Sequence, residues 1–256
     1  AERRNARHAE TRAEAGTRSG GGTRTRTRTG TRAAPGRTGP GTRTVAALMA
    51  VGCAVFAVLA VLVESAWAPL ERMDADVAKT SDRWVRADPV REDVLRILSD
   101  WVWDPFAFRG VALVLCAWLW WRRGARRHVL WAAVALVAAV GISGLCKVAF
   151  DRPRPQGMTV TGPGGSFPSG HVMTATVGAG VVVLLLLPYL SSRVRPWVYA
   201  PAALSVVGVG ITRVVLGAHY LSDVVAGWFL GAAILAASVA VFAWRGADPL
   251  VPPERR

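Results

Sequence analysis

The class of fold is decided by one stretch of the sequence, GGSFPSGHVMTATVGAGVVVLLLLPYL, from Gly164 to Leu190. Its last twenty residues, from His171 onward, form an apolar run. A helix needs about 20 such residues to cross the hydrocarbon core of a bilayer. The residues before this run are small and turn-forming. The sequence therefore predicts a membrane-spanning helix that begins with Pro-Ser-Gly-His, an unusual beginning that needs a chemical reason.

Apolar segments of similar length recur along the chain. We place the spans at residues 44–64, 105–121, 129–149, 171–190, 197–216 and 221–244. The first resembles a signal peptide because SAWA, Ser65 to Ala68, is similar to a cleavage site. However, its apolar run is long and Pro69 would follow the cut, so we expect an uncleaved anchor. The sequence predicts an all-α integral membrane bundle of six transmembrane helices.

The chain is 52% hydrophobic and carries a net charge of +14, so its charged and apolar residues must be segregated. Residues 1–43 hold eleven arginines and almost no large apolar side chain. Such a segment buries too little apolar surface to fold, and we expect a disordered basic N-terminal tail. Attraction to anionic lipid headgroups explains its charge. A nucleic-acid-binding arm is the weaker alternative, and we expect no nucleic-acid partner.

The distribution of Arg and Lys predicts how the membrane domain, residues 44–244, is oriented. With six spans, residues 1–43, 122–128, 191–196 and the C-terminal tail 245–256 share one side, and all are basic. The opposite side holds a long loop, residues 65–104, with more acidic than basic residues. Because basic loops stay in the cytoplasm, we expect both termini to be cytoplasmic and the protein to be multi-pass in the cell membrane.

Part of the 65–104 loop has a helical apolar pattern. Residues 93–103 place five apolar side chains on one helical face: Val94, Ile97, Leu98, Trp101 and Val102. This pattern predicts an amphipathic helix that lies on the outer membrane surface. A simple connector is the alternative.

The remaining ionisable residues near the spans fall at the same predicted end of the bundle. They are Lys147, Asp151, Arg152, Arg154, His171, Arg213, His219 and Asp223. A charge at the centre of a membrane span costs about 2.5–3.5 kcal/mol on the mildest scales, so these residues are expected to share a polar pocket. Interfacial anchoring is the alternative, but it explains only the Lys and Arg residues.

The residue types in this pocket fit a phosphate. Lys147, Arg154 and Arg213 supply positive charge, which suits a dianion. Ser169 and Gly170 open a helix whose free N–H groups can bind an anion at close range. Pro-Ser-Gly-His is therefore predicted to be an anion cradle with a histidine at its edge.

Two histidines supply reactive groups. His219 and Asp223 are spaced i, i+4 and are expected to share a helical face. A carboxylate on one ring nitrogen leaves the other as a nucleophile, and His171 remains to protonate a leaving oxygen. Few ligands are available for a metal, and three cations would repel one, so we expect neither a metal nor another cofactor.

Three ordered motifs carry a family resemblance. KVAFDRPRP fits K-x6-RP through Lys147 and Arg154, PSGH ends at His171, and TRVVLGAHYLSD fits S-R-x5-H-x3-D with Thr212 in place of serine. The chain resembles the type 2 phosphatidic acid phosphatase (PAP2) superfamily in its six-helix membrane branch. A second Arg-Pro pair at Arg152 also adjoins the first motif.

The resemblance implies a role for each matching residue. His219 would be the nucleophile that forms a phosphohistidine, Asp223 would orient it, and His171 would be the general acid. The residues that would bind the phosphoryl group are Lys147, Arg154, Ser169, Gly170 and Arg213. Arg152 is a further candidate for phosphoryl binding.

The implied function is metal-independent hydrolysis of a lipid phosphate or pyrophosphate at the outer face of the membrane. Undecaprenyl pyrophosphate and phosphatidate or phosphatidylglycerophosphate are the two candidate kinds of substrate. The alternatives are a lipid-linked phosphotransferase that uses the same histidine and a non-catalytic lipid-binding or transport protein. The sequence leaves the oligomeric state open.

Overall fold

The computed structural model describes residues 40–103, 105–155 and 164–244, and the regular elements within these ranges are all helical. The long helices are α1 (Pro40–Glu64), α2 (Ala68–Arg86), α4 (Pro105–Arg123), α5 (Arg126–Phe150), α6 (Gly170–Leu186), α7 (Pro196–Val215) and α8 (Leu221–Trp244). The shorter ones are α3 (Pro89–Ile97), a π-helix η1 (Leu98–Val102) and a 3₁₀-helix η2 (Leu187–Tyr189).

Six segments in the described ranges are long and apolar enough to cross a membrane, and they contain α1, α4, α5, α6, α7 and α8. This confirms the predicted all-α, multi-pass membrane fold, and most predicted span limits agree with the helix limits within a few residues. The predicted tails, residues 1–43 and 245–256, lie outside the described residues except for the start of α1.

The central helix of the bundle is α6, which contacts α4, α5, α7 and α8. It is apolar on every side, as expected of a helix that is surrounded by others. Small residues allow the closest approaches. A Cβ on Gly231 of α8 would lie 3.0 Å from Cβ of Thr176 on α6, and a Cβ on Gly52 of α1 would lie 2.6 Å from a carbonyl oxygen of α8. Glycine at these positions lets neighbouring backbones pack closely.

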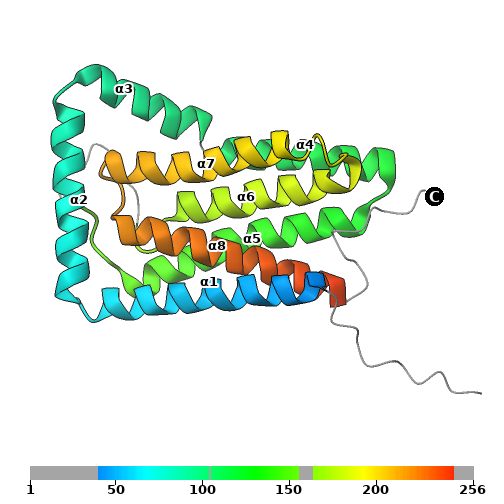
Figure 1. Ribbon diagram of the computed structural model, residues 1–256, viewed down its shortest axis with the longest axis horizontal. Helices are drawn as coiled ribbons and strands as arrows, with labels where there is room; N and C mark the ends of the chain where they lie inside the picture. Colours follow the sequence, from blue (N-terminus) through cyan, green and yellow to red (C-terminus); the bar gives the residue numbers. More distant parts are fainter. Residues whose placement is uncertain (1–39, 104, 156–163, 245–256) are drawn as a thin grey trace, which may run out of the picture. The chain divides into compact units, whose positions relative to one another are not determined.

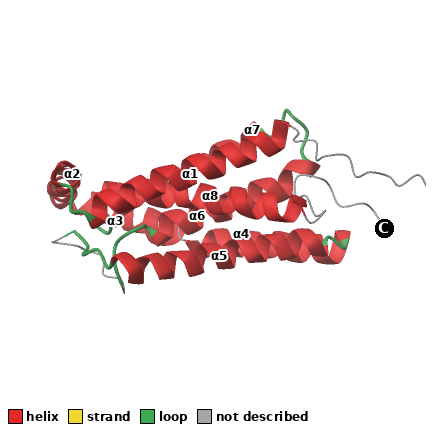
Figure 2. Ribbon diagram, turned by 90° about the horizontal axis from the view of Figure 1, so that it is seen from below, coloured by secondary structure: helices red, strands yellow, loops and turns green. Residues whose placement is uncertain are grey.

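Helix α2 lies across one end of the bundle. In Figures 1 and 2 the spanning helices run in broadly the same direction, whereas α2 runs across their ends. α2 packs against α7 and α8. This helix was not predicted from the sequence.

The residues predicted to form a surface helix are helical in the structure. They lie in α3, whose first turn is capped by the Asp88 carboxylate through the Val90 N–H at 3.0 Å, and in η1. Val94, Ile97 and Trp101 are exposed, and Trp101 is 79% exposed. Contact of this apolar face with the membrane surface stays a prediction.

Candidate active site

The predicted site residues come together at the end of the bundle that α2 crosses. There α5 and α7 end and α6 and α8 begin (Figure 1). Lys147 lies in the last turn of α5 and Arg213 in the last turn of α7. His171 and Asp223 lie in the first turns of α6 and α8. Residues at four helix ends, which are far apart in the sequence, therefore form the site.

The first motif leaves α5 through a sharp turn. Asp151 caps α5 with a left-handed backbone (φ 35°) and donates its N–H to the Lys147 carbonyl at 3.2 Å. The Arg-Pro-Arg-Pro sequence that follows cannot continue a helix, because proline lacks the N–H and fixes φ. The side chains of Arg152 and Arg154 therefore leave the helix at this point. Asp151 itself is exposed, so the prediction that it shares the polar pocket is wrong.

The PSGH segment is held between α5 and α8. Gly165 packs so closely that a Cβ there would lie 3.0 Å from the Lys147 carbonyl oxygen. The Ser166 N–H donates to the Arg152 carbonyl at 2.8 Å, and the Ser169 N–H donates to the Asp223 carbonyl at 3.0 Å. These contacts place the start of α6 directly beside the start of α8.

Ser169 is the N-cap residue of α6, and Gly170 is its first residue, as predicted. The Ser169 hydroxyl is fully buried and has no hydrogen-bond partner among the described residues. A Cβ on Gly170 would lie 3.7 Å from Nζ of Lys147, so the lysine reaches the same helix end. A buried free hydroxyl beside a helix N-terminus and an ammonium group is an arrangement that suits an anion.

The third motif turns back on itself after α7. Gly217 adopts a positive φ of 69°, and the N–H groups of Ala218 and His219 both donate to the Arg213 carbonyl at 3.0 and 3.1 Å. This turn brings His219 back beside Arg213. The Thr212 hydroxyl donates to α7 carbonyls at 3.0 and 3.1 Å, so threonine in place of the motif serine turns this hydroxyl toward the helix backbone.

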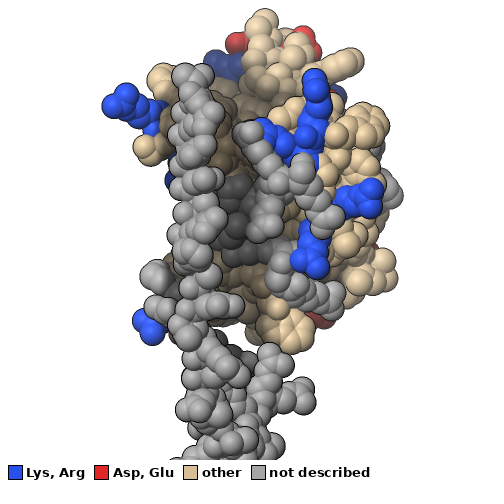
Figure 3. All heavy atoms as spheres, turned by 90° about the vertical axis from the view of Figure 1, so that its right-hand side faces the viewer, with Lys and Arg blue, Asp and Glu red and all other residues tan. Residues whose placement is uncertain are grey.

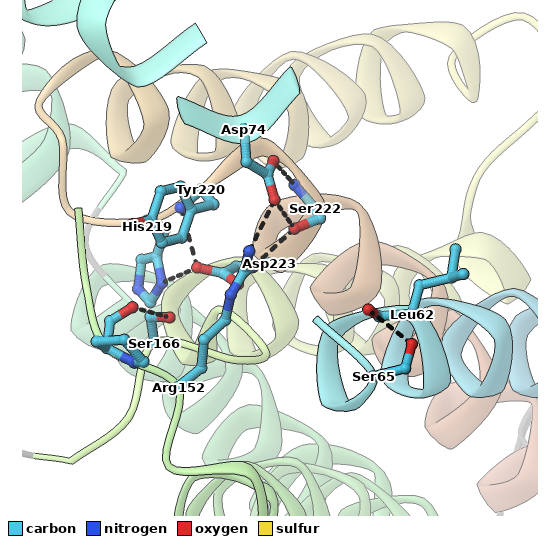
Figure 4. Close-up of polar contacts among 10 residues, drawn as sticks. Leu62, Ser65, Asp74, Arg152, Ser166, His219, Tyr220, Ser222 and Asp223 are labelled. Carbon is cyan, nitrogen blue, oxygen red and sulfur yellow. Dashed lines mark hydrogen bonds and ion pairs between the residues drawn. The ribbon is translucent and has the colours of Figure 1, made fainter. Parts of the chain in front are cut away.

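His219 and Asp223 are neighbours, but not for the reason that the sequence suggested. We expected them to share a helical face, and this is wrong, because His219 lies in the turn before α8 and only Asp223 lies in the helix. Nδ1 of His219 nevertheless lies 3.5 Å from Oδ2 of Asp223 (Figure 4). Both side chains are buried. Because Nδ1 faces the carboxylate, Nε2 is the ring nitrogen left for chemistry.

Arg152 lies among carboxylates. Its Nη1 is 2.6 Å from Oδ1 of Asp223, and its Nη2 is 2.9 Å from Oδ2 of Asp74 on α2 (Figure 4). Burial alone would lower the pKa of Arg152, but the two carboxylates raise it overall. This pairing argues against Arg152 as a further phosphoryl ligand, and that role stays a prediction.

The other cations point to a separate part of the site. Arg154 and Arg213 both lie close enough to Lys147 for their charges to repel its ammonium group. Arg154 donates to the neutral Ala218 carbonyl at 3.0 Å, and burial lowers the pKa of its guanidinium. Arg213 is 4% exposed and lies 3.6 Å from the partly exposed carboxylate of Asp100 on η1. These three side chains, of which Arg213 is buried and the other two are partly buried, form a cluster of positive charge.

A cavity of about 270 Å³ opens beside this cluster. It is lined by Arg109, Val140, Ser143, Gly144, Lys147, Gly170, His171 and Thr174. His171 is close enough to interact electrostatically with Arg213, Lys147 and Arg154. It also interacts with His219. The two histidines therefore lie on the same polar region as the three cations.

His219 is suited to act as a neutral base or nucleophile. Burial lowers the pKa of its imidazole below 6.5, and the carboxylate of Asp223 opposes this shift only in part. The neutral form, which carries the reactive lone pair, therefore predominates at pH 7. Among residues 40–103, 105–155 and 164–244, no group of three or more His, Cys, Asp or Glu side chains is placed to hold a metal ion.

Two residues of this network, Asp74 and Ser222, were not predicted from the sequence. A signal for Asp74 exists. Leu70, Asp74 and Val77 recur at helical spacing, and Leu70 and Asp74 are both buried on the inner face of α2. A carboxylate on the apolar face of an amphipathic helix requires a buried partner. Ser222 lies inside the third motif and has no separate sequence signal.

Together, six apolar helices and a site with two histidines and three cations define a class: a multi-pass membrane protein with a polar site at one end of its helices. Residues 128–247, which hold all three motifs, match the family model of the PAP2 superfamily.

Curated relatives and a solved structure agree with this match. The chain is 45% identical to phosphatidylglycerophosphatase B of Bacillus subtilis over 69 residues, which are 26% of this chain and 34% of that protein. It is 29% identical to the undecaprenyl-diphosphatase BcrC of Bacillus subtilis over 154 residues, 57% of this chain and 72% of that one. The alignment thus spans about a third of the first relative.

The fold is similar to that in the crystal structure of a transmembrane PAP2-type phosphatidylglycerolphosphate phosphatase from Bacillus subtilis. The TM-score is 0.66 at 24% sequence identity, and the match covers 76% of this chain and 96% of that one.

Proposed function

We propose that this protein hydrolyses the phosphate or pyrophosphate group of a membrane lipid. One observation carries the proposal: Lys147 and His171 line one cavity, and the charges of Arg154 and Arg213 act on both side chains. The His219–Asp223 pair lies close enough to interact with His171. Three cations around a pocket with a nucleophile and an acid suit phosphoryl transfer, in which charge on the equatorial oxygens must be stabilised.

The proposed reaction has two steps. Nε2 of His219 attacks phosphorus, the bond from phosphorus to the lipid oxygen breaks, and His171 donates a proton to that oxygen. Asp223 balances the positive charge that develops on the His219 ring. Water then attacks the phosphohistidine and gives a proton to His171, the bond from phosphorus to Nε2 breaks, and inorganic phosphate, free His219 and protonated His171 result. Lys147, Arg154, Arg213, Ser169 and the Gly170 N–H would hold the phosphoryl oxygens throughout.

The substrate is proposed to keep its tail in the bilayer. The cavity is lined by residues of α4, α5 and α6, including apolar Val140 on a spanning helix. The names of the relatives, a phosphatidylglycerophosphatase and an undecaprenyl-diphosphatase, both denote enzymes of phosphorylated lipids. We therefore propose a lipid monophosphate or diphosphate of one of these two kinds as the substrate.

The site is proposed to face away from the cytoplasm. Figure 3 looks onto the opposite end of the bundle, where Lys and Arg side chains are far more prominent than acidic ones. Exposed arginines at that end include Arg122, Arg126, Arg193 and Arg195. The positive-inside rule assigns this end to the cytoplasm.

The orientation has a direct test with single cysteines in a variant that lacks Cys53, Cys116 and Cys146. Thr80→Cys on α2 and Ser192→Cys on the opposite end are both exposed positions. An impermeant thiol reagent added to intact cells should label the first and should label the second only after lysis. The reverse pattern would place the site in the cytoplasm.

The activity is tested with purified protein and a panel of prenyl diphosphates and glycerophospholipids, with inorganic phosphate as the readout. Release of phosphate that is lost in His219→Ala supports the proposal. Transfer to an added alcohol without free phosphate would indicate a phosphotransferase. Binding of lipid without turnover of any substrate would indicate a non-catalytic protein.

A further inference from the structure

The outer helix α2 contributes a buried carboxylate to the site. Asp74 is 1% exposed and lies on the face of α2 that packs onto the bundle, next to buried Leu70. Its Oδ1 accepts the Ser222 N–H at 3.0 Å, and its Oδ2 accepts the Ser222 hydroxyl. Ser222 immediately precedes Asp223, so α2 is tied to the first turn of α8 beside the reactive histidine.

Arg152 links Asp74 to Asp223. Its two terminal nitrogens donate separately, Nη2 to Asp74 at 2.9 Å and Nη1 to Asp223 at 2.6 Å. Nη1 also reaches the Ser222 hydroxyl at 2.8 Å, and the guanidinium lies 4.3 Å from the centre of the Tyr220 ring. A guanidinium can bridge two carboxylates in this way because its donors form a rigid planar fork.

This bridge determines which oxygen of Asp223 faces His219. Arg152 occupies Oδ1 of Asp223, while Oδ2 accepts the Tyr220 N–H at 2.9 Å and lies 3.5 Å from Nδ1 of His219. The carboxylate is thus fixed at both oxygens, and its plane cannot rotate away from the imidazole. Asp74 in turn fixes the rotamer of Arg152 through the second arm of the fork.

The charges of the network favour a positive charge on His219. Arg152 alone with Asp223 would form a neutral pair, whereas the additional carboxylate of Asp74 gives the three groups a net charge of minus one. That charge is buried, so solvent screens it little. It is neutralised when the His219 ring becomes positive on forming its bond to phosphorus.

We propose that Asp74 is a positioning residue for the reaction, acting through Arg152 on Asp223 and His219, and that α2 is therefore part of the catalytic apparatus. This inference rests on the proposed function. The polar partners of Asp74 are Arg152 and Ser222, and Asp74 does not line the cavity. Its removal should therefore slow the chemical step and leave substrate binding unchanged.

The test compares Asp74→Asn with Asp76→Asn, a matched change at an exposed position of the same helix. Asparagine keeps the size and the acceptor for Ser222. We expect kcat of Asp74→Asn to fall about ten- to hundredfold, as for the loss of one charge-assisted hydrogen bond, with KM within about twofold of wild type. Asp76→Asn should match wild type. The rate of phosphoenzyme formation in a single turnover should fall with kcat.

Two readouts separate positioning from a structural role. Removing a buried negative charge should lower the pKa of His219, so the acid limb of kcat/KM should move to lower pH in Asp74→Asn on the same substrate. In an Arg152→Gln background, where the link is already broken, adding Asp74→Asn should cost less than about twofold, because residues that act through one network are not additive.

The outcomes are distinct. Equal kcat for Asp74→Asn and Asp76→Asn, or fully additive losses with Arg152→Gln, would overturn the inference and leave the proposed function standing. Wild-type protein that releases no phosphate would instead overturn the proposed function. If Asp74→Asn is not recovered folded, Arg152→Gln is compared with the double variant: an equal or higher kcat in the double variant supports the inference, and a further tenfold loss contradicts it.

Discussion

The two halves of the site differ in how their charged groups are arranged. In the carboxylate half, formed by Asp74, Arg152, Ser222 and Asp223, the charged groups are bonded to one another at 2.6–2.9 Å. In the cation half, formed by Lys147, Arg154 and Arg213, positive groups lie together beside a cavity. A buried excess of one charge is costly unless a partner arrives. Each charged group of the carboxylate half therefore has a partner of opposite charge within the protein, although the half keeps a net charge of minus one, and the cation half is suited to an anionic ligand.

Arg152 and Arg154 show this difference within one segment. They are two residues apart, yet the first bridges two carboxylates and the second donates to a neutral carbonyl. The predictions that follow test this division, from the largest expected effect to the smallest.

The largest difference is expected for His171→Ala. If His171 protonates the leaving oxygen, a lipid alkoxide needs it and p-nitrophenolate leaves largely unaided. General-acid catalysis is typically worth about 10²–10⁴-fold, so the lipid monophosphate should lose far more activity than p-nitrophenyl phosphate. Steady-state rates on the two substrates measure this. Equal losses, with chemistry rate-limiting, would remove His171 from that role.

A smaller loss is expected for Asp223→Asn. The variant keeps the shape of the side chain but removes the charge that faces His219 and the partner of Arg152. We expect kcat to fall about a hundredfold, near the upper range for loss of a hydrogen bond to a charged group. A fluorescence or calorimetric melt in detergent checks that the fold is retained. An unchanged kcat in folded protein would contradict the account of the carboxylate half.

The two arginines should separate in their response to vanadate, a phosphoryl mimic. Arg154→Gln should weaken inhibition by vanadate at least about tenfold, because a charge-assisted contact to the anion is lost. Arg152→Gln should lower kcat but change the inhibition constant less than about twofold. Arg195→Gln, at the opposite end, is the matched control for loss of one charge. If Arg152→Gln and Arg154→Gln weaken the inhibition by vanadate equally, both arginines bind the anion and the division of the site into two halves is contradicted.

The smallest effect is expected from chelation. Three cations already supply the positive charge that a metal would provide to a phosphoryl group, so activity should change less than about twofold after treatment with EDTA. Loss of activity that Mg²⁺ or Zn²⁺ restores would show that the cation half is incomplete.

The spans and the motif residues could be predicted because both depend on local patterns. Apolar length specifies a membrane helix regardless of its neighbours, and the motif fixes the spacing of Lys147, His171 and His219. Asp74 could not be assigned in the same way, since its partners Arg152 and Ser222 are 78 and 148 residues away and meet it only when α2 crosses the bundle.

The route by which His219 meets Asp223 was also hidden from the sequence. An i, i+4 spacing indicates one helical face, but the turn at Gly217 ends α7 and delays the start of α8 until Leu221. The contact survives because the His219 side chain folds over the first turn of α8. The i, i+4 spacing thus correctly predicted that Asp223 is the partner of His219, but it wrongly predicted that both residues lie in one helix.

The most direct test of the account is to trap the phosphoenzyme. Wild-type protein is mixed with a ³²P-labelled lipid phosphate, quenched in alkali within one turnover and digested for peptide analysis. The account predicts acid-labile, alkali-stable phosphate on the peptide that contains His219, and none in His219→Ala. Phosphate on another residue, or the same labelled fraction in His219→Ala, would contradict the assignment of His219 as the nucleophile.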